Sequence, residues 1–160
     1  NSHTLPLTLA MDFLAITLTS LGNISERRVF YLLSNLGKEI ETEIDYPIFQ
    51  RIIEGILNEN RRLSIPASIE SPILFEKTID IKGMGGSSAI KCEQVVKNIE
   101  EILAIELILA TSQWKKKQFD YHSDLFKEYL TFMADEEVTT LKKQIEHTIQ
   151  FFNNTQNYNL

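Results

Sequence analysis

Residues 95–114, VVKNIEEILAIELILATSQW, decide the fold class of this chain. Apolar side chains recur in this stretch at steps of three and four, the spacing that places them on one face of an α-helix. They are Val95, Val96, Ile99, Ile102, Leu103, Leu107 and Ile108. Ser87 or Ser88 is the expected N-cap, and Lys115–Lys117 complement the negative end of the helix dipole. A helix of this length with one apolar face indicates an all-α protein.

Five further helices are expected, four from the same spacing and the first from a run that is apolar on nearly all sides. They cover residues 5–21, 25–36, 47–62, 125–133 and 138–152. Gly22-Asn23 is expected to end the first of these, Ser25 to cap the second, and the acidic residues 135–137 to cap the last. The fold expected is therefore a bundle of long helices over residues 1–152.

Two segments are expected to lie outside this bundle. Residues 64–86 contain Pro66, Pro72 and three glycines, which favour an irregular loop, and Thr78–Lys82 alternate within it like one short strand. Residues 153–160 are rich in Asn and predict a flexible tail.

Composition narrows the possible partners. The chain has 160 residues, of which 43% are hydrophobic and 24% charged, values typical of a globular protein. Its 16 Lys and Arg against 22 Asp and Glu give a net charge of −6, which argues against nucleic acid or an anionic membrane surface as a partner. The apolar run Leu5–Leu21 contains Asp12 and three threonines, with Thr4 directly before it, and is interpreted as a buried helix, too short and too polar to span a bilayer. The single cysteine, Cys92, excludes an internal disulfide and favours the cytoplasm.

Residue patterns by themselves do not identify a reaction. Gly83–Ser88 resembles a phosphate-binding loop but lacks a Lys directly before the helix, so a turn followed by a helix start is the preferred interpretation. Asp120–Asp124 surround a histidine, yet Asp and Ser before an apolar run are typical of a helix N-terminus. His147 is interpreted as a solvated helical histidine and Cys92 as a small core residue. We expect no metal site and no Ser-His-Asp arrangement.

Several segments in order do resemble a known family. Asn1-Ser2-His3-Thr4 and Pro6 resemble a Gly-Asn-Phe-His-Gly-x-Pro stretch, and residues 21–28 resemble Leu-Gly-x-(Ile/Leu)-Ser-Glu-Arg-Arg. Residues 58–61 and 66–71 are similar to Ser-Glu-Asn-Lys and Pro-x-Ser-Val-Asp-Ser, and residues 102–106 to Val-Leu-Ala-Ile-Glu. These stretches belong to the aromatic amino acid ammonia-lyases, which include histidine, phenylalanine and tyrosine ammonia-lyases. The resemblance extends from Asn1 to about Trp114.

The resemblance implies that this chain is the C-terminal helical portion of a larger protein. Family members eliminate ammonia with a methylidene-imidazolone formed from an internal Ala-Ser-Gly, which lies upstream of the matched region. No Ala-Ser-Gly occurs in these 160 residues, so we expect no cofactor and no catalytic residue in this segment. The implied partners are the rest of its own polypeptide, further copies in a homotetramer, and histidine or an aromatic amino acid if the protein is active.

The segment that resembles the family's active-site loop departs from it. Residues 77–84 align with Asn-Gln-Glu-Asp-His-Val-Ser-Met and retain only Asp80 and Met84. Ile79 replaces a carboxylate, and an aliphatic side chain neither accepts a proton nor binds an amine. Ser2 replaces a phenylalanine, which removes ring surface from the expected pocket. The residues that the resemblance assigns to a degenerate substrate pocket are Ser2, His3, Thr78, Ile79 and Lys82.

Three functions remain open from the sequence. The first is an ammonia-lyase-like segment with a diverged site. The second is a catalytically inactive homologue or helical oligomerisation module, with residues 99–108 as the seam. The third is an anion-binding helical domain that uses Gly83–Ser88.

Overall fold

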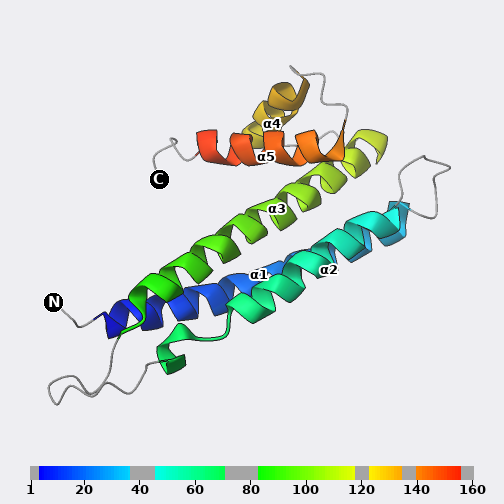
Figure 1. Cartoon of the computed structure of the whole chain (residues 1–160). Helices are drawn as coiled ribbons and strands as arrows, with labels where there is room; N and C mark the ends of the chain where they lie inside the picture. The colour runs from blue at the N-terminus through cyan, green and yellow to red at the C-terminus, as the bar shows by residue number, and fades with distance from the viewer. Residues whose placement is uncertain (1–3, 37–45, 71–82, 118–122, 135–139, 156–160) are drawn as a thin grey trace, which may run out of the picture.

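The computed structural model describes residues 4–36, 46–70, 83–117, 123–134 and 140–155. It contains five α-helices and one short 3-10 helix, in the order shown in Figure 1. They are α1 (Leu5–Leu36), α2 (Tyr46–Leu63), η1 (Ala67–Glu70), α3 (Gly85–Lys117), α4 (Asp124–Ala134) and α5 (Leu141–Thr155). The described residues hold no strand, and the segment expected to form one, Thr78–Lys82, lies outside them. The all-α prediction is confirmed.

Three long helices form the body of the molecule. Figure 1 shows α1 and α3 running in the same direction with α2 antiparallel beside them, while α4 and α5 lie near the C-terminal half of α3. The core between the long helices is aliphatic, because each contributes the face on which its apolar residues recur. Its fully buried members include Val29, Ile53, Leu57, Ile102 and Ile105.

The expected break at Gly22-Asn23 is wrong, because α1 continues through it to Leu36. Gly22 is buried, and a Cβ placed on it would lie 2.8 Å from both the Ile99 Cδ1 and the Leu57 Cδ2 atoms. The absence of a side chain there lets α2 and α3 approach α1 closely. Ser25, expected to cap a second helix, instead lies inside α1 and is fully buried.

The helix ends follow local capping signals in some places and not in others. Ser123 precedes α4 as expected, and its Oγ accepts a hydrogen bond from the Phe126 N–H at 3.2 Å. At α3, the first helical bond runs from the Ser88 N–H to the Met84 carbonyl, so Met84 occupies the cap position expected for Ser87 or Ser88. Thr140 takes the corresponding place before α5, and residues 135–137, expected there, lie outside the described residues.

Within the described parts of the chain, one helix is long and apolar enough to cross a membrane by length and composition alone. It is α1, where an 18-residue window within residues 5–34 has a mean hydropathy of 1.5. The expectation that this region is too short and too polar assumed two shorter helices. Its buried polar side chains, among them Asp12, Thr19 and Glu26, all have hydrogen-bond partners in the structure. The face that carries Asp12 and Thr19 therefore packs inside the protein.

Candidate functional site

The residues assigned by resemblance to the substrate pocket lie outside the described residues. They are Ser2, His3, Thr78, Ile79 and Lys82. The two segments that carry them nevertheless approach each other at their described ends. A Cβ on Gly83 would lie 2.7 Å from the Leu5 nitrogen, and one on Gly85 would lie 3.1 Å from the Thr4 Cβ. We call this contact between Thr4, Leu5, Gly83 and Gly85 the α1–α3 junction.

A carboxylate fixes a further element beside the junction. Asp12 on α1 accepts hydrogen bonds from the backbone N–H groups of Ala67, at 3.0 Å, and Ser68, at 2.9 Å. Burial by itself would raise the pKa of this carboxyl, but the amide bonds from Ser68 and Ala67 outweigh it, and the pKa lies below its usual value. Asp12 therefore holds η1 against α1 as an anion.

Lys91 connects the same region to α3. Its ammonium donates to the Ile65 carbonyl at 3.2 Å and lies 3.4 Å from a carboxylate oxygen of Glu70. In the sequence it is the lysine that follows the glycine-rich segment Gly83–Ser88. In the structure its ammonium group contacts Ile65 and Glu70. The start of α3 therefore has the features of a turn followed by a helix N-terminus, without a lysine directed to it from position 91.

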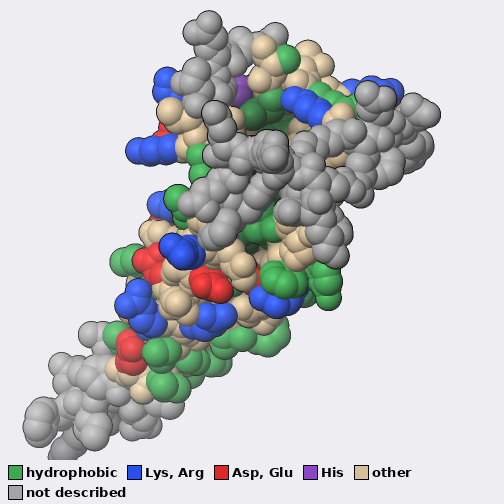
Figure 2. Space-filling model, turned by 90° about the vertical axis from the view of Figure 1, so that its right-hand side faces the viewer, with side chains coloured by type: hydrophobic (Ala, Val, Ile, Leu, Met, Phe, Trp, Pro, Cys, Tyr) green, Lys and Arg blue, Asp and Glu red, His purple; other side chains and the backbone are tan. Residues whose placement is uncertain are grey.

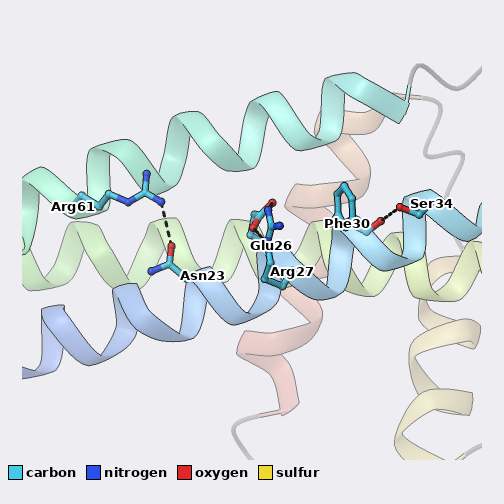
Figure 3. Close-up of polar contacts among 6 residues, drawn as sticks. All are labelled: Asn23, Glu26, Arg27, Phe30, Ser34 and Arg61. Atoms are coloured by element: carbon cyan, nitrogen blue, oxygen red, sulfur yellow. Dashed lines mark hydrogen bonds and ion pairs between the residues drawn. The ribbon is translucent and has the colours of Figure 1, made fainter.

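Two of the segments that carry the resemblance meet at Glu106. Ser25 donates to this carboxylate at 2.5 Å, and Arg28 donates to it through Nη2 at 2.9 Å and pairs through Nε at 2.5 Å. This hydrogen bonding raises the pKa of the Arg28 guanidinium, and the pair joins α1 to α3. The neighbouring Glu26 is buried and binds Arg27, which lies over the Phe30 ring (Figure 3).

A third segment contributes a buried amide pair. The Asn98 Nδ2 donates to the Asn60 Oδ1 at 2.8 Å and to a Glu59 carboxylate oxygen at 2.9 Å. Asn60 is fully buried, and its Nδ2 has no acceptor in the part of the chain that the structure describes. Next to it, Arg61 reaches from α2 to the Asn23 side chain on α1, as Figure 3 shows.

Sequence reasoning did not single out these interhelical pairs. A signal was present, because Asn60 follows Leu57 by three residues and Asn98 follows Val95 by three, which places both amides on the faces that carry the apolar stripes. A polar residue at such a position needs a buried partner. The motif residues that meet in the described structure thus hold helices together.

One expectation about a single titratable residue, His147, is wrong. His147 is buried, against the expectation of a solvated side chain, because its ring stacks on Phe132 with centroids 4.1 Å apart and its Nε2 lies 3.2 Å from the Phe132 carbonyl oxygen. Cys92 is buried as expected, and burial raises the pKa of its thiol. Among the described residues no three His, Cys, Asp or Glu side chains gather into a metal site, and residues 120–122 lie outside that set.

Comparison with known proteins gives consistent matches. The family model described as aromatic amino acid lyase matches residues 1–130. A histidine ammonia-lyase from Caldanaerobacter subterraneus subsp. tengcongensis is 38% identical over 119 residues, which cover 69% of this chain and 23% of that protein. A histidine ammonia-lyase from Streptococcus sanguinis is 28% identical over 170 residues, covering 96% of this chain and 33% of the other.

A solved structure matches as well. The crystal structure of histidine ammonia-lyase from Trypanosoma cruzi superimposes with a TM-score of 0.78 and 27% identity, covering 93% of this chain and 31% of that chain. The chain therefore spans between 23% and 33% of the length of these relatives.

Proposed function

Because the chain belongs to the aromatic amino acid lyase family, we propose that it is the C-terminal helical segment of an ammonia-lyase-like protein. The proposed reaction is the non-hydrolytic elimination of ammonia from histidine or an aromatic amino acid. The α1–α3 junction carries the proposal, since it brings together the described ends of the two segments that resemble the family's substrate pocket.

The electrophile that this family implies does not fit the residues present. A methylidene-imidazolone needs Ala-Ser-Gly, and these 160 residues contain none. Elimination would therefore depend on a group formed by polypeptide beyond this sequence. The contribution proposed for this chain is the positioning of two pocket segments, through the glycines of the junction and through Asp12, which holds η1.

The proposed protein partners are the rest of the polypeptide and further copies of it in a homotetramer. α1 exposes a row of apolar side chains, and a helix of a monomeric protein rarely leaves such a row in water. The row consists of Leu9, Phe13, Ile16, Ile24 and Tyr31, exposed by between 41% and 68%. On the face seen in Figure 2, hydrophobic side chains also interrupt the charged surface.

A second candidate is a catalytically inactive homologue that serves as a helical oligomerisation module. Ile79, which stands where relatives have a carboxylate, favours it, as does the exposed apolar row on α1. For either function we propose a cytoplasmic location, which suits a chain whose one cysteine is buried and free.

The test is an assay of the natural polypeptide that contains these residues. It is incubated with histidine, phenylalanine and tyrosine, and formation of the conjugated unsaturated acid is followed by ultraviolet absorbance together with released ammonia. Formation of product from any of the three supports the lyase. A homotetramer that releases no ammonia, and whose spectrum shows no imidazolone that borohydride removes, would favour the inactive module instead.

A further inference from the structure

A groove of about 430 Å³ lies where α5 packs on α3, with Ile52 of α2 also in its lining, and nothing above accounts for it. Its lining combines four aliphatic with three charged side chains. The lining residues are Ile52, Glu101, Leu141, Lys142, Ile145, Glu146 and Ile149. Its volume falls within the range of small-molecule sites, which are typically apolar with a few polar groups that fix orientation. None of these residues belongs to the α1–α3 junction.

The groove carries one uncompensated charge. Lys142 and Glu146, one turn apart on α5, pair with each other at 3.8 Å. Glu101 is half-buried and has no hydrogen-bond or ion-pair partner among the described residues. Burial raises the pKa of its carboxyl, and the negative charge of Glu59 on α2 raises it further.

Removing a carboxylate from water beside an apolar surface costs free energy when the carboxylate has no partner. The attraction of a cation placed against it would offset that cost. Glu59 does not supply one, because it is itself an anion that accepts a hydrogen bond from Asn98. The arrangement disfavours an anionic ligand for the same reason. The charge that complements the groove is positive, and the surface that surrounds it is aliphatic.

We propose that this groove binds an organic ammonium ion, with the ammonium paired to Glu101 and an apolar body packed against Ile52, Ile145 and Ile149. The site recognises the pairing of a positive head with an alkyl or aryl body. A neutral ligand of the same shape fills the groove without compensating Glu101, so it binds more weakly.

Calorimetric titration of the full chain with 4-phenylbutylammonium, 4-phenylbutanol and 4-phenylbutyrate tests this proposal. The three probes share a body and differ in head group. We expect the ammonium to bind about tenfold more tightly than the alcohol, the size of effect typical of a charged hydrogen bond, and the carboxylate to bind most weakly. Affinity for the ammonium should also fall on acidification, because only ionised Glu101 pairs with it.

Three variants separate charge pairing from shape. Glu101→Gln should reduce ammonium affinity to that of the alcohol while leaving alcohol binding unchanged. Glu54→Gln, on the exposed side of α2, makes the same change in net charge and should leave all three affinities unaltered. Ile149→Ala should weaken the ammonium and the alcohol together, and circular dichroism confirms that each variant is folded.

Several outcomes would overturn the proposal. Equal binding of the three probes would make the groove a non-selective apolar surface. Equal weakening by Glu54→Gln and Glu101→Gln would assign the effect to net charge rather than to this site. Absence of ammonium binding, together with self-association seen by sedimentation, would indicate that a second copy of the chain, and not an ammonium ion, occupies the groove. The assay for ammonia release is read separately, so the proposed function can fail while this site stands, and the reverse.

Discussion

Asp12 shows how a buried charge stabilises this structure through backbone partners. Its two oxygens accept one amide hydrogen each, from Ala67 and Ser68. In Asp12→Asn one oxygen is replaced by an NH₂ that cannot accept, and the charge is lost. We expect the free energy of unfolding, measured in urea, to fall by about 2 kcal/mol. Asp124→Asn, at a fully exposed side chain, should leave it nearly unchanged.

The pH dependence of that loss has a defined sign. The folded-state pKa of Asp12 is lowered, so its contribution is complete above the unfolded-state pKa of about 4 and disappears as pH falls through the folded value. The difference between wild type and Asp12→Asn should therefore shrink on acidification below about pH 4. A difference that stays constant over this range would contradict a role for the ionised carboxylate.

Glu101 is expected to behave in the opposite way. Burial and Glu59 raise its pKa, so the folded chain binds this proton more readily than the unfolded chain does, and ionisation of Glu101 costs stability. Without ligand, Glu101→Gln should raise the melting temperature at neutral pH. The gain should grow as pH rises from the unfolded pKa through the raised folded one, then level off. Glu54→Gln is the control and should leave the melting temperature unchanged at each pH.

At the level of helices, two glycines in similar backbone settings should respond differently to substitution. Gly55 on α2 has no atom within 4 Å of an added Cβ, so Gly55→Ala should raise the free energy of unfolding by about 1 kcal/mol through helix propensity. Gly22 on α1 faces Ile99 and Leu57, so Gly22→Val should lower it by about 1–3 kcal/mol through overpacking. Denaturant titration of both variants measures the contrast, and a stable Gly22→Val would show that α1 packs more loosely.

Gly83 gives a related prediction for the junction. An added Cβ there meets backbone atoms of Thr4 and Leu5, which cannot rotate away as the end of a side chain can. Gly83→Ala should therefore displace the loop from the start of α1. We expect ammonia release by the natural polypeptide to fall at least about tenfold, as for other misplaced sites, while its melting temperature changes little. Gly86→Ala, with open space around it, should retain activity.

These elements also show what the sequence alone can predict. Periodicity located α2 and α3 because it reports the buried face of each, as residues 95–114 illustrate, whereas an apolar run located the first half of α1. The predictions at Gly22 and Ser25 were wrong. They rested on residue type alone, because glycine is typical of a helix end and serine of a helix N-cap. Both residues are small because α1 lies close to its neighbours there: Gly22 faces α2 and α3, and Ser25 binds Glu106 on α3. No local pattern identifies a partner about 80 residues away.

At the scale of the whole molecule, the candidate site was less predictable than the fold. The resemblance named pocket residues in residues 1–3 and 77–82, which the structure does not describe. It could not reveal that other matched motifs contribute Arg28, Glu106 and Asn60 to the Arg28–Glu106 and Asn60–Asn98 pairs between helices. Such pairs depend on how α1, α2 and α3 assemble.

Assembly itself can be tested on the exposed row of α1. Phe13 is 68% exposed, so Phe13→Glu should leave the fold intact while removing apolar area from the proposed contact with further copies. We expect a smaller sedimentation coefficient for the natural polypeptide, with unchanged circular dichroism. Ile69→Glu, at a 74% exposed residue of η1, is the control. A tetramer that tolerates Phe13→Glu would place the contact elsewhere.

The separation of α1 from α3 along the chain has a consequence for folding. Glu106 on α3 lies 81 residues after its partner Ser25 on α1, so the part of α1 that packs on α3 stays uncovered until translation has passed α3. At about 5–20 residues per second this interval lasts several seconds, during which a long apolar helix is available for aggregation or chaperone binding. Contacts between α1 and α3 are distant in sequence, and such contacts raise the contact order and slow folding. We therefore expect the yield of folded protein to depend on the rate of synthesis and on temperature, even if the folded protein is stable.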